Sequence, residues 1–417
     1  MTSEGLTRRF VLLRAMRWLP VGLVLPFLVI TPESRGLSLS EIGAVFAVHS
    51  GVAIALEVPS GALADTVGRR RVLLAGAALT AVSLVIFAVA DGVAAFMASV
   101  ALLAAGRALI SGSLEAWYVD SLRVLDPAAP LSHGLSRGTA AEGIAMALGA
   151  LAGGGLVTLA GPSGGTGALS GYGIASLAGA VAALAYLAAV AALVDQGPRR
   201  GHATDTRGST RRRALEIFAT AREEAAGSLV VRVVFLTGVA LGMSFTAVEL
   251  LWQPRLADLL GHARAHGLVF GALAAAAMLA VAAGASASTT VNRRLGLRLG
   301  YLVALAFAAI CIALLGAPGS PAAFALVYLL AYLGLGVAEP MHFELLNDAV
   351  GATARATLIS AESLAAQGGA LGANLSVGAL ASTHGPSLAW ALAGTLLVLT
   401  VLAAAFALGR VAPAVRA

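Results

Sequence analysis

The sequence predicts an all-α membrane protein of twelve transmembrane helices, arranged as two pseudo-symmetric six-helix bundles. Of its 417 residues, 59% are hydrophobic and only 12% are charged, roughly half the charged fraction of a soluble domain. Apolar stretches of about 20 residues, each long enough to cross ~30 Å of hydrocarbon as a helix, recur along nearly the whole chain. A membrane β-barrel would instead show ~10-residue segments of alternating polarity, and that pattern is absent.

The apolar segments fall into two groups of six, separated by a charged stretch. The first six are expected at 10–31, 39–62, 72–91, 94–118, 137–160 and 172–195. The last six are expected at 229–254, 267–290, 299–317, 322–346, 356–381 and 387–409. The stretch between them holds seven arginines and four acidic residues, so it cannot lie in hydrocarbon, and its second part can form a short amphipathic helix. We expect a six-helix bundle at 1–195, a cytoplasmic linker at 196–228 and a second bundle at 229–417.

The distribution of arginines predicts the orientation in the membrane. All 27 basic residues are arginine. The side that holds both termini and the linker carries 20 of them, whereas the opposite side carries Arg35, Arg255 and Arg264. Because basic loops stay in the cytoplasm, we expect a multi-pass protein of the plasma membrane with both termini cytoplasmic. No small-residue cleavage site follows the first span, so we expect it to be retained.

Several function classes are excluded by the composition. The net charge of +6 does not indicate nucleic-acid binding, because the arginines lie in short loops between apolar spans. The single cysteine, Cys311, allows neither an intrachain disulfide nor a cysteine-based metal site. We find no phosphate-binding loop, nucleophile constellation or metal-ligand spacing, and therefore expect no enzyme, cofactor or metal. The expected partners are a small-molecule substrate, protons and the lipid bilayer, and we expect a monomer.

A charged turn, GALADTVGRRR, follows the second predicted span at 61–71. We expect only about nine residues to join two antiparallel helices, and Gly61 and Gly68 permit tight packing and unusual backbone angles. Asp65 can accept hydrogen bonds from a helix N-terminus. The stretch ASTTVNRRLGLR at 287–298 likewise places a basic cluster after the second span of the second half. Such internal duplication is typical of secondary transporters.

This turn resembles the loop signature of the major facilitator superfamily, in outline G-x-L-a-D-r-x-G-r-k. The matching residues are Gly61, Leu63, Asp65, Gly68, Arg69 and Arg70. The segments RGLSLSEIG, EVPSGALAD, SGSLEAWYVDSL and ELLWQPRL are similar to the drug:proton antiporters of that superfamily, the multidrug efflux families. The sequence departs from the antiporter motifs at two places. Arg107 precedes Gly112 by five residues rather than the four of the span 4 motif, and LGALAGGGL lacks the proline of the span 5 motif.

The resemblance implies that the turn forms a cytoplasmic gate with the start of span 11. The expected gate residues are Glu57, Gly61, Asp65, Gly68, Arg69 and Asp120. Asp120 is expected to pair with this turn structurally. The alternative is a simple topology anchor, for which the arginines suffice. In the fold of the superfamily, spans 3, 6, 9 and 12 face lipid, and none of these four has a charged residue in its interior; the eighth span, at 267–290, has none either.

Ionisable residues inside the other spans indicate a cavity, because such residues usually face a bundle interior or water. The residues expected to line a cavity for substrate and protons are Arg17, Arg107, Glu115, Trp117, Glu142, Glu249, Trp252, Gln253, Glu339, His342, Glu344 and Gln367. Desolvation favours the protonated form of a carboxylate without a permanent partner, which makes Glu115 and Glu142 the leading proton carriers. The alternative for each acid is a structural ion pair, and Arg17 is expected to pair with one of them.

The polar residues of spans 7 and 10 allow further alternatives. Glu339 and His342 are three residues apart and so share a helix face, which suits a proton relay or cation recognition. Metal binding with Glu344 is disfavoured because only one histidine is present. Trp252 lies near the outer end of its span, and the alternative to a cavity role is an anchor in the aromatic belt.

We expect proton-coupled efflux of hydrophobic or cationic compounds, such as a drug or secondary metabolite, by alternating access. The alternative is proton-coupled uptake of a small polar solute by symport. This function would prefer a cavity richer in paired arginines and polar groups for anionic ligands, and Arg17 and Arg107 keep it open. A third possibility is a non-transporting sensor or assembly factor, which would predict an added soluble domain or long tail. The chain shows neither.

Overall fold

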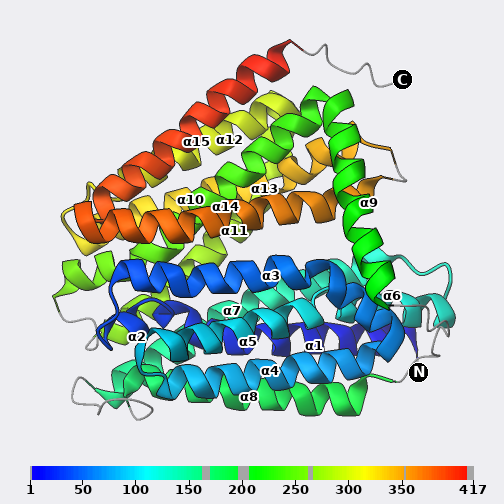
Figure 1. Ribbon diagram of the computed structural model, residues 1–417, viewed down its shortest axis with the longest axis horizontal. Helices are drawn as coiled ribbons and strands as arrows, with labels where there is room; N and C mark the ends of the chain where they lie inside the picture. Colours follow the sequence, from blue (N-terminus) through cyan, green and yellow to red (C-terminus); the bar gives the residue numbers. More distant parts are fainter. Residues whose placement is uncertain (1, 162–169, 196–205, 262–265, 352–353, 411–417) are drawn as a thin grey trace. The chain divides into compact units, whose positions relative to one another are not determined.

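The computed structural model describes residues 2–161, 170–195, 206–261, 266–351 and 354–410. Every regular element among them is a helix (Figure 1). Eleven helices or helix pairs are long and apolar enough to cross a membrane by length and composition. The helix α14 (Arg355–His384) is not among these, although it has 30 residues, because Glu362, Gln367 and Asn374 lower its hydropathy. The predicted fold class, an all-α membrane protein, is confirmed.

The described chain divides into two compact units. Unit 1 comprises Met1–Leu37, Val48–Arg211 and Leu260–Ala276. Its helices are α1 (Ser3–Val24), η1 (Leu25–Phe27), α2 (Ile30–Glu33), most of α3 (Leu39–Val67), α4 (Arg69–Val89), α5 (Gly92–Ile110), α6 (Ser113–Leu125), α7 (Leu131–Ala160) and α8 (Gly171–Leu193). Within this unit α1 packs against α7 and α8, while α4 packs against α5 and α8.

Unit 2 comprises Ser38–Ala47, Arg212–Leu259 and Ala277–Ala417. Its helices are α10 (Leu229–Leu260), most of α11 (Gly267–Leu295), α12 (Leu297–Leu314), α13 (Pro321–Ala349), α14 and α15 (Pro386–Gly409). Within this unit α12 packs against α13 and α15. The helix α9 (Thr206–Gly227) lies in the predicted linker, whose second part was expected to be helical. The predicted domain boundaries themselves stay a prediction.

Two helices contribute their first turns to the unit that does not hold the rest of them. The first turns of α11 belong to unit 1, where the Leu268 N–H donates to Thr158 Oγ1 of α7 at 2.8 Å. A Cβ on Gly154 would meet the Gly267 carbonyl oxygen at 2.7 Å. The first turns of α3 belong to unit 2, where a Cβ on Gly378 of α14 would lie 3.2 Å from Gly43 Cα. Glycine is needed at these crossings because the helix backbones touch.

A single glycine connects α3 to α4 and, in the other unit, α11 to α12. Gly68 has φ +98° and Gly296 has φ +77°, a region that L-residues with side chains rarely adopt. No heavy atom lies within 4 Å of a Cβ built on either residue. Glycine is therefore required by the backbone angle and not by a lack of space for a side chain. The expectation of a nine-residue turn is wrong, because α3 continues as helix through Val67.

The predicted fourth span, 94–118, is also interrupted. The helix α5 ends at Ile110, and Gly112 adopts a left-handed conformation with φ +72° before α6 begins at Ser113. The break changes the direction in which the side chains of α6 point, and it therefore determines where Glu115 lies.

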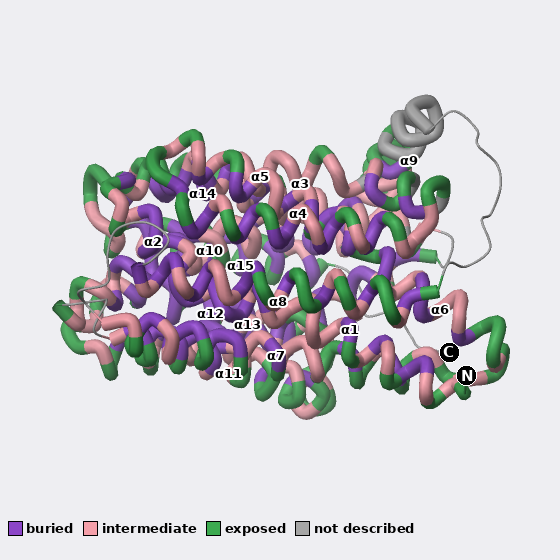
Figure 2. The backbone as a smooth tube through the Cα atoms, turned by 90° about the horizontal axis from the view of Figure 1, so that it is seen from below, coloured by how far each residue is buried: buried purple, intermediate pink, exposed green. Residues whose placement is uncertain are grey.

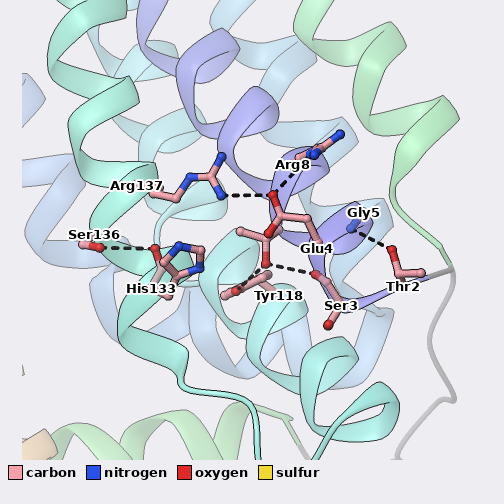
Figure 3. Close-up of polar contacts among 10 residues, drawn as sticks. Thr2, Ser3, Glu4, Gly5, Arg8, Tyr118, His133, Ser136 and Arg137 are labelled. Carbon is pink, nitrogen blue, oxygen red and sulfur yellow. Dashed lines mark hydrogen bonds and ion pairs between the residues drawn. The ribbon is translucent and has the colours of Figure 1, made fainter.

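The core of unit 1 gathers around α1, α6 and α8. Phe10 stacks on Tyr118 with ring centroids 4.2 Å apart, and the Tyr118 hydroxyl lies 3.0 Å from Thr7 Oγ1. At the same end of α1, the Glu4 carboxylate accepts from Arg8 and from Arg137 of α7 (Figure 3). Buried and exposed stretches alternate along the helices (Figure 2). Exposed apolar side chains such as Leu159 and Phe406 suit a surface that faces lipid.

Candidate functional site

Four ionisable side chains form a cluster of salt bridges in unit 1, which we call the ion cluster. Arg14 donates from Nε to Glu142 Oε2 at 2.9 Å and lies 3.2 Å from Glu115 Oε1 through its NH1 atom. Arg17 lies 3.6 Å from the same Glu115 oxygen, so the predicted pairing of Arg17 with an acid is present. The helices α1, α6 and α7 supply these residues. Their side chains are 12–28% exposed, which leaves them within reach of water.

Arg107 lies beside the ion cluster and has a different environment. Its guanidinium carbon is 5.7 Å from the centroid of the Trp18 ring, which Arg17 approaches at 5.4 Å. Arg107 is solvent-exposed even though it lies in a membrane span. It interacts electrostatically with Arg17, Glu57 and Glu142, but in the described part of the chain no carboxylate lies within 4 Å of it. A guanidinium in this setting can bind a carboxylate or phosphate in a bidentate manner.

Glu115 retains unused hydrogen-bonding capacity. Its Oε1 atom faces Arg14 and Arg17, whereas its Oε2 atom is buried without a hydrogen-bond partner among the described residues. A buried acceptor without a donor is costly. The free oxygen is therefore a place where a donor group of a ligand would be stabilised.

A second polar group, which we call the polar chain, crosses unit 2. The Tyr301 hydroxyl donates to Thr237 Oγ1 at 2.8 Å and lies 2.9 Å from His342 Nδ1. His342 Nε2 lies 3.0 Å from Glu362 Oε1. The residues come from α10, α12, α13 and α14, and their exposed fractions are 0% for Thr237 and Tyr301, 3% for His342 and 7% for Glu362. Four helices are thus joined by one buried hydrogen-bonded path.

Glu249 of α10 lies among aromatic rings of unit 2. The Tyr332 hydroxyl donates a hydrogen bond to its carboxylate. The Tyr332 ring lies 4.7 Å from that of Tyr328 and 5.9 Å from that of Phe245, and Trp252 lies 5.4 Å from Tyr328. In the described residues no arginine or histidine forms an ion pair with Glu249. A carboxylate among π faces can bind an organic cation.

The sequence as a whole decides the family. The model of the Major Facilitator Superfamily matches residues 10–373. The chain belongs to the major facilitator superfamily. It is therefore a multi-pass membrane transporter, and its relatives are transporters rather than enzymes. No curated protein matches the sequence.

Solved structures of the superfamily share this fold. A mutant of the nucleoside transporter NupG superposes with a TM-score of 0.79 at 12% identity, covering 96% of this chain and 99% of that one. A mutant peptide transporter POT in complex with sulfate gives a TM-score of 0.76 at 16% identity, covering 98% and 94%. At these identities the likeness shows the fold alone. Nothing in the comparisons points to the drug:proton antiporters in particular.

Trp117 does not line a cavity, contrary to expectation. It is 4% exposed and lies in the hydrophobic core of unit 1 with Leu114, Tyr118 and Leu122. Residues three and four apart share one helix face, and on α6 that face is directed into the core. The same rotation directs Glu115, one residue after Leu114, toward α1.

Part of the gate that the superfamily resemblance implies can be located. Arg69 NH1 and Asp120 Oδ2 form an ion pair at 2.8 Å, so the predicted pairing of Asp120 with this connection is present. Glu57 is half-buried and Gly61 is exposed, both on α3. The side chain of Asp65 and residues 352–353 before α14 lie outside the described part of the chain. The clamp between Asp65 and span 11 therefore stays a prediction.

The predicted residues of span 10 do not form one site. His342 is buried, whereas Glu339 is exposed, because residues three apart on a helix differ in direction by about 60°. Glu344 accepts a hydrogen bond from Asn292 of α11 at 3.1 Å. Among the described residues no group of three His, Cys, Asp or Glu could hold a metal ion. The other two predicted positions are Gln253, which is buried, and Gln367, which is half-buried.

The sequence reasoning omitted several residues that contact these sites: Trp18, Thr237, Tyr301, Tyr332 and Glu362. An ionisable residue inside a span is a usable signal, and it does mark Glu362 on the sequence, although Glu362 is not among the residues expected to line the cavity. Tyrosine and threonine give no comparable signal, since both are common in buried helix faces.

Proposed function

We propose that this superfamily member is a proton-coupled symporter that takes up a small polar solute carrying an anionic group. The observation that carries the proposal is Arg107, an exposed guanidinium inside a span with no carboxylate within 4 Å in the described residues. A charge at that depth is costly unless it serves a ligand or an ion pathway. The ring of Trp18 supports its guanidinium plane.

The ion cluster supplies the proton side of the proposal. Arg14 and Arg17 both face Glu115, and the second oxygen of that carboxylate has no hydrogen-bond partner among the described residues. Arg107 interacts electrostatically with Glu142. An anionic ligand on Arg107 would weaken this attraction, and protonation of Glu142 would then become more favourable. Solute and proton would therefore bind together, as symport requires.

Solved structures with this fold support a polar solute. The two described above are of a nucleoside transporter and a peptide transporter, the latter in complex with sulfate. Nucleosides, peptides and sulfate are all polar. They favour the uptake of a polar solute over the export of hydrophobic drugs.

The direction of proton movement gives a decisive test. Purified protein in liposomes at equal internal and external pH is given a dipeptide, a nucleoside or tetraphenylphosphonium outside, while a trapped dye reports internal pH. Symport carries protons inward with the solute, so the lumen acidifies. Antiport moves protons outward against the entering solute, so the lumen becomes alkaline. Uptake of radiolabelled solute without any pH change would contradict proton coupling.

Variants of Arg107 test the binding site. Arg107→Ala should abolish solute-driven acidification, and Arg107→Lys should recover part of it, because lysine keeps the charge but lacks the bidentate fork. Arg8→Ala is the matched control, since the Arg8 side chain is 74% exposed. Equal activity of Arg107→Ala and Arg8→Ala would contradict the proposed site.

Efflux of organic cations is the second candidate, and the setting of Glu249 favours it. The carboxylate lies among Tyr332, Tyr328 and Trp252, and aromatic faces attract cations by up to about 2 kcal/mol when desolvated. In the liposome assay this function predicts an alkaline lumen with tetraphenylphosphonium. Glu249→Gln would remove that response and leave the response to anionic solutes intact.

We further propose a plasma-membrane protein whose termini and linker 196–228 are cytoplasmic and whose bundles are 1–195 and 229–417. The arginine distribution supports this orientation. Cys311 is the single cysteine, so a Ser3→Cys variant in a Cys311→Ser background has one thiol. An impermeant maleimide should label it in everted vesicles and not in intact cells. The opposite pattern would reverse the orientation.

A further inference from the structure

The donors and acceptors of the polar chain can be assigned in sequence. Thr237 Oγ1 lies 2.9 Å from the Val233 carbonyl oxygen, and a carbonyl only accepts, so the Thr237 hydroxyl donates there. The Thr237 oxygen then accepts from the Tyr301 hydroxyl. Tyrosine has one hydroxyl hydrogen, so the Tyr301 oxygen must accept from His342 Nδ1, 2.9 Å away. His342 therefore carries a hydrogen on Nδ1.

This assignment fixes what lies between His342 and Glu362. With Nδ1 occupied, the Nε2 atom of a neutral imidazole is an acceptor, and a carboxylate oxygen is also an acceptor. Their separation of 3.0 Å is a hydrogen-bond distance, so one proton must lie between them, on the imidazole or on the carboxyl group. In either case the pair as a whole is neutral. A neutral pair is also what burial at 3% and 7% exposure favours.

We propose that His342 and Glu362 form a buried site for one exchangeable proton, and that release of this proton reverses the hydrogen bonds of Tyr301 and Thr237. On release the proton passes to water and the charge of the pair changes from 0 to −1. After release, the imidazole of His342 is neutral and the Glu362 carboxylate is ionised. The pair stays hydrogen-bonded if the one remaining imidazole hydrogen is on Nε2, which faces the carboxylate, rather than on Nδ1. The bare Nδ1 then accepts from Tyr301, whose only hydrogen is withdrawn from Thr237.

The site also contacts the backbone of α10. A Cβ on Gly238 would lie 2.6 Å from Glu362 Oε1, so the carboxylate rests directly against α10 one residue beyond Thr237. A negative charge formed on Glu362 would therefore be felt by α10 at two adjacent positions. The change in hydrogen bonding and the change in charge act on the same turn.

Other charged residues on the packed helices set the surroundings. The nearest in sequence to the four members of the chain are Arg232 on α10, Arg298 on α12, Glu339 and Glu344 on α13, and Arg355 on α14. Arg232 and Glu339 are exposed. Glu344 accepts from Asn292. Within the described part of the chain the ion partner of Glu362 is His342. The charge of this pair therefore depends mainly on the proton that the two residues share.

The site itself stands on geometry, whereas its role in coupling rests on the proposed function. The first experiment therefore does not involve transport. Full-length protein labelled with ¹⁵N-histidine is placed in nanodiscs, and the His342 resonances are assigned by their loss in His342→Gln. Below the transition Nδ1 should be protonated; above it the hydrogen should be on Nε2. The change should occur in one step.

Variants decide whether the step belongs to the pair. Glu362→Gln should abolish it, because an amide cannot release the shared proton. Gly238→Ala, which displaces the carboxylate, should shift the step, and Tyr301→Phe should remove the Nδ1 preference. Glu344→Gln and His384→Gln, on the same two helices, are controls that should leave it unchanged. A His342 titration unaffected by Glu362→Gln, or a hydrogen on Nε2 at every pH, would overturn the site.

The liposome assay then separates the site from its role. If the site couples transport, solute-driven acidification should fall at least tenfold in Glu362→Gln, with solute binding retained. Undiminished acidification in that variant would overturn the coupling role while the resonance data still establish the site. Absence of acidification in the unmodified protein would overturn the proposed function and with it the coupling role, but not the one-proton site.

Discussion

Unit 1 holds its internal polar groups as ion pairs, whereas unit 2 holds them as a hydrogen-bonded chain. In the ion cluster, Arg14 contacts two carboxylates and Glu115 contacts two arginines, and the side chains stay partly exposed. In the polar chain, each atom from Thr237 to Glu362 has one neighbour on each side and almost no exposure. The first arrangement is branched and the second is linear.

The difference indicates how each unit would respond to a ligand. A branched cluster with an unused oxygen on Glu115 can exchange one partner for another while keeping the rest. A linear chain has no spare donor, so adding or removing one proton must reorder all of its bonds. We infer that unit 1 is suited to binding variable groups, and unit 2 to registering a single proton.

The largest expected effect breaks the branched cluster at its centre. Arg14→Gln leaves Glu142 without its hydrogen-bonding cation and Glu115 with only the longer contact to Arg17. Removing one partner of an ion pair costs about 3 kcal/mol or more when the pair is fully buried and less in a partly exposed cluster, so the thermal unfolding midpoint in detergent should fall by an amount between these limits. The double variant Arg14→Gln with Glu142→Gln should be more stable than the single one. If instead the losses simply add, the two residues are not coupled.

A pair of tyrosines compares the two units directly. Tyr301→Phe leaves the buried His342 Nδ1 without its partner and removes the donor to Thr237 Oγ1, which costs about 2 kcal/mol. Tyr186→Phe in unit 1 removes a buried hydroxyl that has no hydrogen-bond partner among the described residues, and should change stability by less than about 0.5 kcal/mol. Equal losses in thermal unfolding would show that the polar chain adds nothing beyond burial.

The connecting glycines test where the units are alike. Gly68→Ala and Gly296→Ala each force a side chain into a positive-φ backbone, which costs about 1–2 kcal/mol. The two losses should agree, because the connections have the same one-residue form. Gly61→Ala, on an open face of α3, is the control and should be neutral or stabilising by up to about 1 kcal/mol. A loss of stability in only one of the two variants would mean that the two connections do not have the same backbone requirement.

The smallest effect concerns a pair at the surface of unit 1. Asp120→Asn removes the partner of Arg69, but the Asp120 side chain is 47% exposed. Such pairs contribute less than about 1 kcal/mol, and salt screens them. The small loss of stability should therefore shrink further in 1 M NaCl. A loss that is independent of salt would mean that Asp120 makes a buried contact.

How far the sequence predicts this molecule depends on the kind of contact. Span positions follow from hydropathy along the chain, and the ion pairs of Arg17 and Asp120 follow because a charge in a span must find a partner. The sequence does not reveal helix rotation. It could not show that Trp117 turns into the core, or that the partner of His342 is Glu362 rather than Glu339. These outcomes depend on packing between helices far apart in sequence, and on the break at Gly112.

The exchange of first turns has a consequence for how the protein is made. Unit 1 includes Leu260–Ala276, and within this segment the Leu268 N–H donates a hydrogen bond to Thr158 Oγ1 of α7. The ribosome reaches Ala276 about 65 residues after Arg211, the previous residue of that unit, which takes roughly 3–13 s at ordinary rates of synthesis. During that interval the face of α7 around Gly154 and Thr158 lacks its contacts with α11 and must contact lipid or the insertion machinery instead. An amino-terminal half expressed alone would lack these contacts permanently.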